Sequence, residues 1–315
     1  MGFEGLLGNQ RLKENLTGSL RRGRISHFYL ISGPEGSGKH TLARLLAAAI
    51  LCQDQQNPCL QCNHCRKVLA DTHPDFVTVT DPEHKNIAVK IVRDIRDDMF
   101  IRPNEGSHKL YLFAQDLGVE GQNALLKVLE EPPAYGVFII MTDNPEKLLP
   151  TVRSRCTELS LQPLPEATMK SWLTREFPQA EPETVAAAIA RSGGYLGQAI
   201  TLLSEGDALP PQTESFVRSF RDRNSLELLQ TLVPMEKWKR DQLIPILSGW
   251  IQLLEEALAC RAGMPVVSPL ARELSTGRSS GELMNALRNL QKALEYAQGN
   301  VSTAAICGWL AWVLR

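Results

Sequence analysis

The sequence predicts an α/β domain with a parallel sheet, followed by a small helical domain and an all-helical C-terminal domain. Two observations carry this prediction. Over the first 160 residues, short apolar runs rich in Val, Ile, Phe and Tyr alternate with helical patterns, which is typical of a parallel sheet with helices on both faces. After residue 163 only helical patterns remain, and they are rich in Ala and Leu.

Five stretches are expected to form the strands, because they are rich in β-branched and aromatic residues. They are HFYLISG (27–33), DFVTVT (75–80), KLYLF (109–113), GVFIIMT (136–142) and TELSL (157–161). Helices are expected between them, including 39–52, 91–100 and 121–131, and the last of these ends at two prolines.

Two proline-containing breaks divide the chain. The alternating pattern ends at LQPLPEA (161–167), and a second break falls at SEGDALPPQT (204–213). We therefore expect an α/β domain over residues 1–162, a small helical domain over 163–207 and an all-helical domain over 208–315.

The composition is that of an ordinary globular protein, with 22% charged and 43% hydrophobic residues in 315. A formal net charge of -1 argues against a protein that coats nucleic acid by bulk charge. The N-terminus lacks the pattern of a signal peptide, and no run of 18 apolar residues indicates a membrane span. We expect a cytoplasmic protein with reduced thiols and no membrane contact.

The glycine-rich turn in ISGPEGSGKHTLA nearly matches a phosphate-binding loop. Gly33, Gly36, Gly38 and Lys39 are present, but His40 stands where a Ser or Thr belongs. The loop backbone and the lysine bind phosphates, whereas the missing hydroxyl binds magnesium, which prefers oxygen ligands. We therefore expect a P-loop type domain without ATP hydrolysis. The sequence leaves open whether the loop still binds ATP and magnesium.

A hydrolytic site would also need an acidic pair after a later strand, to hold magnesium and polarise water. The strand KLYLF continues into AQDLG, where Asp116 is the only acid and Gln115 precedes it. We expect Asp116 to be a helix-capping or loop residue. The site therefore has a second defect, independent of the first.

Four cysteines in CQDQQNPCLQCNHC give the strongest chemical signal. Cys52, Cys59, Cys62 and Cys65 are separated by six, two and two residues. Two overlapping C-x-x-C steps place three thiolates around one point, and the first cysteine can complete a tetrahedron, which suits structural zinc. His64 is a spare candidate ligand. The alternatives are a disulfide, which a reducing compartment disfavours, an iron–sulfur cluster, or unliganded thiols.

Two arginines follow the strand GVFIIMT, in NPEKLLPTVRSRC. Arg153 and Arg155 lie two residues apart near an expected helix end. The spacing alone allows two interpretations. They are either arginines favoured by the helix dipole, or one of them is an arginine finger that reaches a phosphate on another subunit.

Six motifs together resemble bacterial clamp-loader subunits of the AAA+ class. They are ISGPEGSGKHTLA, the four-cysteine insert, THPDF, NALLKVLEEPP, NPEKLLPTVRSRC and GGYLGQA, in the order and spacing of that family. The resemblance covers residues 1 to about 205, and the remainder matches only as an all-helical region of the right length. It implies an AAA+ domain with a helical lid, followed by a helical collar that carries assembly.

The departures from the ATPase pattern resemble the delta-prime branch of this family. Besides His40 and the lone Asp116, Gln198 stands where the ATPases carry a sensing arginine. The resemblance implies a non-catalytic subunit of the DNA polymerase III clamp loader. Its partners would be gamma/tau and delta subunits in a hetero-pentamer, which loads a sliding clamp on primed DNA. Arg155 would be the finger that acts in trans on ATP bound by a neighbouring gamma/tau subunit.

Two other hypotheses remain at this point. The first is an ATP-hydrolysing, gamma-like subunit, against which His40, Asp116 and Gln198 argue. The second is a zinc-dependent protein-binding or DNA-binding module, a hypothesis that the complete α/β domain and the arginine segment make unnecessary.

Overall fold

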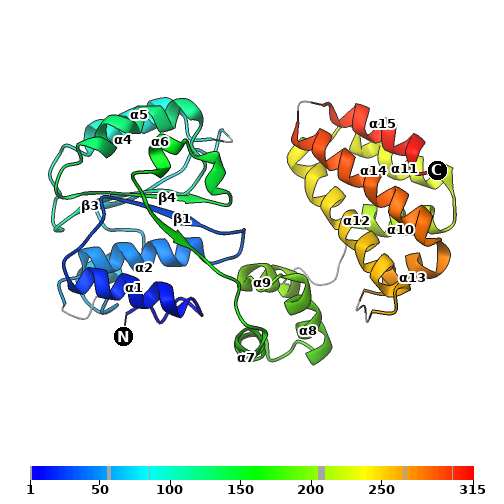
Figure 1. Ribbon diagram of the computed structural model, residues 1–315, viewed down its shortest axis with the longest axis horizontal. Helices are drawn as coiled ribbons and strands as arrows, with labels where there is room; N and C mark the ends of the chain where they lie inside the picture. The colour runs from blue at the N-terminus through cyan, green and yellow to red at the C-terminus, as the bar shows by residue number, and fades with distance from the viewer. Residues whose placement is uncertain are drawn as a thin grey trace. The chain divides into compact units, whose positions relative to one another are not determined.

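A computed structural model of the chain describes residues 2–54, 58–84, 86–204, 210–264, 266, 268–299 and 301–315. The chain forms two compact units, Met1–Ser204 and Glu205–Arg315 (Figure 1). The predicted boundary near residue 207 lies within 205–209, outside the described residues. The predicted boundary near residue 162 falls inside the first unit, so the division into three domains stays a prediction.

The first unit contains a sheet of five parallel strands in the order β2-β3-β4-β1-β5. The strands are β1 (Phe28–Ser32), β2 (Phe76–Val79), β3 (Lys109–Phe113), β4 (Gly136–Thr142) and β5 (Thr157–Ser160). Every residue of β1, β3 and β4 is buried, as expected for central strands covered on both faces. The predicted parallel sheet is therefore confirmed.

Helices cover both faces of the sheet, with α1 and α2 on one side and α4, α5 and α6 on the other (Figure 1). The helices are α1 (Gln10–Arg21), α2 (Lys39–Leu51), α3 (Asn63–Leu69), α4 (Val89–Asp98), α5 (Val119–Glu130) and α6 (Pro150–Arg153), with a 3-10 turn at Pro145–Lys147. Successive residues of β1 point to opposite faces of the sheet. Ile31 packs in the hydrophobic core on the α2 side, and Leu30 packs in the core on the α5 side.

Three helices complete the first unit: α7 (Glu166–Glu176), α8 (Pro182–Arg191) and α9 (Leu196–Ser204). They enclose a small core of their own. Its buried members are Met169, Leu173, Val185, Ala188, Ile189 and Ala199. Gly193 and Gly194, both with positive φ, form the turn before α9, whose first turn contacts the phosphate loop.

The second unit contains α10 (Pro211–Arg221), α11 (Ser225–Met235), α12 (Arg240–Arg261), α13 (Pro269–Gly277), α14 (Ser280–Gln298) and α15 (Thr303–Val313). The Trp250 indole lies at the centre of this unit, stacked on Phe216 at 4.1 Å between ring centroids. Its Nε1–H donates to Thr213 Oγ1 at 3.2 Å. By length and composition alone α12 could cross a membrane, yet Leu243, Trp250 and Leu254 place it in this core.

Candidate functional site: a phosphate loop, a cysteine cluster and an exposed arginine

The phosphate loop connects β1 to α2 at the carboxyl edge of the sheet. Gly36 and Gly38 have φ values of 73° and 95°, in the left-handed region that favours glycine. The Lys39 ammonium lies within the loop and donates to the carbonyl oxygens of Gly33 at 2.6 Å and Pro34 at 2.9 Å. The structure therefore brings Gly33, Gly36, Gly38 and Lys39 together, as the motif predicts.

The neighbouring positions do not supply a magnesium ligand. His40 is the second residue of α2 and is exposed, so an imidazole stands where the motif requires a hydroxyl. The hydroxyl of Thr41 is one residue further along the helix, which is about 100° around its axis. The first predicted defect of the site is thus present in its geometry.

Two carboxylates near the phosphate-loop lysine, Asp116 and Asp143, are bound to a second lysine. Lys147 Nζ lies 2.8 Å from Asp116 Oδ2 and 2.6 Å from Asp143 Oδ1, and Thr142 Oγ1 donates to Asp116 Oδ1 at 3.2 Å. The hydrogen bond from Lys147 lowers the pKa of Asp143. Asp116 is a loop residue, because the cap of α5 is Gly118. Lys147 therefore forms ion pairs with both carboxylates.

The first turn of α9 touches the phosphate loop directly. The Gly197 N–H donates to the Gly36 carbonyl oxygen at 2.9 Å, and the Gln198 amide donates to the Glu35 carbonyl oxygen at 2.9 Å. Gln198, which the resemblance matches to a sensing arginine of the ATPases, is thus bound to loop backbone. Sequence reasoning missed the role of Gly197, since only the fold brings it to Gly36.

The four cysteines lie together between α2 and β2. Their Sγ atoms are all within 4.8 Å of one another, and the pairs Cys52–Cys62 and Cys59–Cys65 are each 3.9 Å apart. Bonds of 2.3 Å to a tetrahedral zinc ion would place sulfurs about 3.8 Å apart. A disulfide needs about 2.05 Å, so all four are free thiols. The arrangement fits a tetrahedral metal ion.

Backbone N–H groups support thiolates in the cluster. The N–H groups of Cys59, Cys62 and Cys65 each point at the Sγ of the preceding cysteine, at 3.3 to 3.5 Å. The N–H of Gln61 leads the groups that lower the pKa of Cys59 to about 7, whereas burial raises the pKa of Cys65. Because Cys65 is fully buried, its thiolate needs an adjacent cation. The cysteines can therefore hold a structural metal.

Arg155 lies at the surface just beyond α6. Its guanidinium donates to the Thr151 carbonyl oxygen at 2.7 Å and to Glu130 Oε1 at 2.9 Å. The side chain remains 36% exposed, so it can contact another chain. The neighbouring Arg153 is equally exposed and pairs with Glu146 at 2.5 Å.

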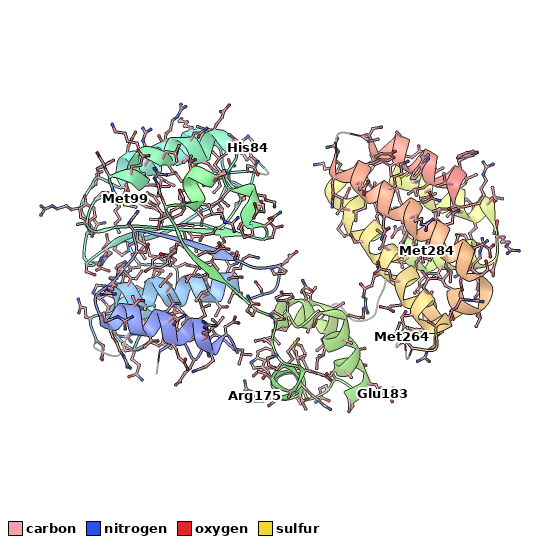
Figure 2. The ribbon with its side chains drawn as sticks, in the orientation of Figure 1. His84, Met99, Arg175, Glu183, Met264 and Met284 are labelled. Carbon is pink, nitrogen blue, oxygen red and sulfur yellow. The ribbon has the colours of Figure 1, made fainter. Side chains whose placement is uncertain are left out.

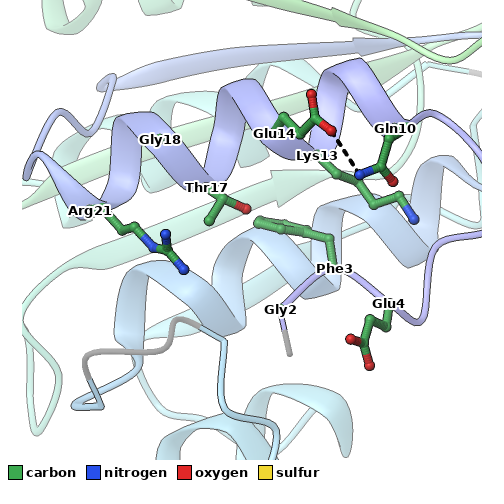
Figure 3. Close-up of a pocket in the computed structure, with 9 residues that line it drawn as sticks. All are labelled: Gly2, Phe3, Glu4, Gln10, Lys13, Glu14, Thr17, Gly18 and Arg21. Carbon is green, nitrogen blue, oxygen red and sulfur yellow. Dashed lines mark hydrogen bonds between the residues drawn. The ribbon is translucent and has the colours of Figure 1, made fainter.

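A separate groove of about 430 Å³ lies between the N-terminal residues and α1 (Figure 3). Phe3 lies in it, and Lys13, Glu14 and Arg21 give it charges of both signs. Its lining residues belong neither to the phosphate loop nor to the cysteine cluster. We assign it no role in the site.

The first half of the chain matches a known protein family. Residues 8–165 match the family described as "DNA polymerase III, delta subunit". The chain belongs to this DNA polymerase III delta-subunit family. The matched residues include the phosphate loop, the four cysteines, Asp116 and Arg155, whereas α9 and the second unit lie outside the match.

Individual relatives of this family member come from two subunit types. The chain is 38% identical to the DNA polymerase III subunit delta' of Pseudomonas aeruginosa over 55% of its own length and 54% of the relative's. It is 36% identical to the subunit delta' of Escherichia coli over 62% of its own length and 59% of the relative's. It is also 36% identical to the subunit gamma/tau of Mycobacterium tuberculosis over 55% of its own length and 31% of the relative's. The chain therefore spans about a third to three fifths of the lengths of these relatives.

Proposed function

We propose that this chain is a non-catalytic, delta-prime-like subunit of a DNA polymerase III clamp loader. In this role it helps to load a sliding clamp on primed DNA, in the cytoplasm, as part of a hetero-pentamer with gamma/tau and delta subunits. Family membership supports the proposal, as do the delta' and gamma/tau names of its relatives. The second unit would be the collar through which the chain joins its partners.

One observation carries the non-catalytic part of the proposal: the groups around the phosphate loop are engaged with protein partners. Asp116 pairs with Lys147, and Gln198 bonds to the loop backbone. His40 supplies nitrogen where magnesium requires oxygen. Hydrolysis needs a bound magnesium ion and a polarised water, and these residues provide neither.

Arg155 is proposed to act on a neighbour's ATP. A guanidinium placed beside a γ-phosphate neutralises the charge that develops during transfer, and its planar fork suits phosphate oxygens. Its exposure at the end of α6 supports this role, because a residue acting in trans has to reach the surface. Glu130 would hold the guanidinium in position until the neighbour's phosphate is present.

The cysteine cluster is proposed to hold one structural zinc ion, bound by Cys52, Cys59, Cys62 and Cys65. All four coordination positions are filled by thiolates, so the ion would stabilise the insert and take no part in catalysis. Its distance pattern and the free state of the thiols support this assignment.

Reconstitution tests the proposed function. The chain is mixed with candidate gamma/tau and delta subunits, and the mass of the complex is measured together with its clamp-loading activity. We expect a hetero-oligomer that contains this chain and loads the clamp. Loading at an equal rate by a complex that lacks the chain would contradict the proposal.

The gamma/tau relatives favour one alternative, an ATP-hydrolysing gamma-like subunit. The two functions differ in the behaviour of the isolated chain. Sustained ATP turnover that Lys39→Ala abolishes would establish the alternative, whereas its absence supports a non-catalytic subunit.

A further inference from the structure

His64 and His73 form a buried pair beside the cysteine cluster, which the proposed function does not use. They are 8% and 3% exposed, and His64 Nδ1 lies 2.8 Å from His73 Nε2. Together with Glu105 they place three potential metal-ligand atoms within 4.8 Å of one another. By composition and spacing, these three side chains could hold a second metal ion.

The hydrogen bond to the far side of His73 argues against a second metal. The backbone N–H of Asp75 donates to His73 Nδ1 at 3.0 Å, so that nitrogen carries no proton. A neutral imidazole then carries its proton on Nε2. A metal on Nε2 would leave both nitrogens without protons, and Glu105 is already held by Lys67 at 2.7 Å. His73 therefore donates from Nε2 to His64.

The hydrogen bond from His73 also sets the proton position on the His64 ring. Because His64 accepts at Nδ1, its proton is on Nε2, and the side-chain amide of Gln53 lies 2.9 Å from that atom. Half a turn of the amide exchanges its nitrogen and oxygen, which places the oxygen as the acceptor. One continuous chain of hydrogen bonds thus links Gln53, His64, His73 and the backbone of Asp75.

These hydrogen bonds connect the beginning of the cysteine insert to its end. Gln53 follows the ligand Cys52, His64 precedes the ligand Cys65, and His73 lies beyond α3. The bond between Gln53 and His64 therefore limits the movement of Cys52 relative to Cys65. Those are the first and last of the four ligands in the sequence, and the bond adds to the packing of α3 on α2, where Cys65 Sγ lies 3.6 Å from the Ala48 carbonyl oxygen.

From this geometry we infer that His64 is a positioning residue for the cysteine cluster. Its ring holds Gln53 on one side and His73 on the other, so the four thiols stay preorganised for a tetrahedral ion. The inference rests on the metal site of the proposed function. Residues that orient metal ligands commonly change metal affinity by about 10- to 100-fold when they are replaced.

The experiment measures zinc loss from the full-length, zinc-loaded protein to excess EDTA. His64→Ala should lose zinc about tenfold faster than wild type. His73→Gln keeps an amide donor for His64 Nδ1, so its rate of zinc loss should lie between those of wild type and His64→Ala. His84→Ala is the matched control, since His84 is an exposed histidine in the loop before α4 whose ring bonds to Asp81, outside the cysteine cluster (Figure 2). Equal rates for His64→Ala and wild type would overturn the inference.

Two further measurements keep the outcomes separate. Metal analysis of the wild type comes first, and a protein without zinc would contradict the proposed metal site itself. If His64→Ala does not fold, Gln53→Ala tests the same restraint from its exposed end, where we expect an acceleration of about threefold. Unchanged zinc loss from Gln53→Ala and His73→Gln together would overturn the positioning role while leaving the metal site intact.

Discussion

The contact between α9 and the phosphate loop allows a prediction whose size follows from the geometry. A Cβ added to Gly197 would lie 2.6 Å from Gly36 Cα and 2.9 Å from its carbonyl oxygen. Both are backbone atoms, so no side-chain rotation relieves the clash. Gly197→Ala should therefore push α9 away from the loop, at an overpacking cost of about 1–3 kcal/mol. At 1.36 kcal/mol per factor of ten, the contact opens about 5- to 160-fold more often.

Hydrogen exchange at the amide of residue 197 measures this opening, because that N–H donates to the Gly36 carbonyl oxygen. Gly249→Ala is the matched control. Gly249 lies inside α12 with no atom within 4 Å of an added Cβ, so alanine should stabilise the helix by about 1 kcal/mol. Unchanged exchange at residue 197 in Gly197→Ala would refute the contact.

Three more predictions concern the cysteines, the phosphate loop and a buried carboxylate. Cys62→Ser should reduce bound zinc and loosen the insert while the sheet stays folded, which metal analysis and circular dichroism would check. His40→Thr should not create steady ATP turnover, because Asp116 remains paired and unable to hold magnesium; sustained hydrolysis by this variant would show that a single defect explains the inactive site. Asp75 is fully buried, which favours a higher pKa, but the N–H groups of residues 104–106 outweigh this and lower the pKa below its usual 3.8. A lowered pKa means that its contribution to the free energy of unfolding is present at neutral pH and is lost as the pH falls below about 4. Urea denaturation should therefore show a gap between wild type and Asp75→Asn that narrows from pH 7 to pH 3, and a constant gap would count against this.

The strands and the cysteine cluster could be predicted because their signals are local. Buried parallel strands leave continuous apolar runs, and all five expected runs lie in the sheet. The cysteines converge because their short spacing leaves the backbone few alternatives. In contrast, α3 has only seven residues, which is too short for a helical period to appear in the sequence.

The remaining features of the site depend on residues that are distant in the sequence. The contacts between Gly36 and Gly197, and between Asp116 and Lys147, form only when the sheet and the helices have assembled. The motif predicted Arg155 as a candidate arginine finger but did not indicate its partner Glu130, which lies at the end of α5. Periodicity and spacing carry no information about such pairs.

The proposed role of Arg155 can be separated from any effect on stability. Its ion pair with Glu130 joins two side chains that are 36% and 53% exposed, so its loss should change the free energy of unfolding by at most about 1 kcal/mol. Loss of an arginine finger lowers hydrolysis at the facing site by about 10³-fold. Arg153→Ala is the matched control, because Arg153 is an equally exposed arginine that also pairs with carboxylates of its own chain.

The most direct test compares two variants of this chain in an otherwise wild-type reconstituted clamp loader. The measured quantity is the rate of DNA-stimulated ATP hydrolysis. Lys39→Ala alters the chain's own phosphate loop and should leave the rate unchanged, whereas Arg155→Ala should lower it, by less than the single-site factor because other sites stay intact. The opposite pattern, a loss with Lys39→Ala and a wild-type rate with Arg155→Ala, would contradict a non-catalytic subunit that acts on its neighbour.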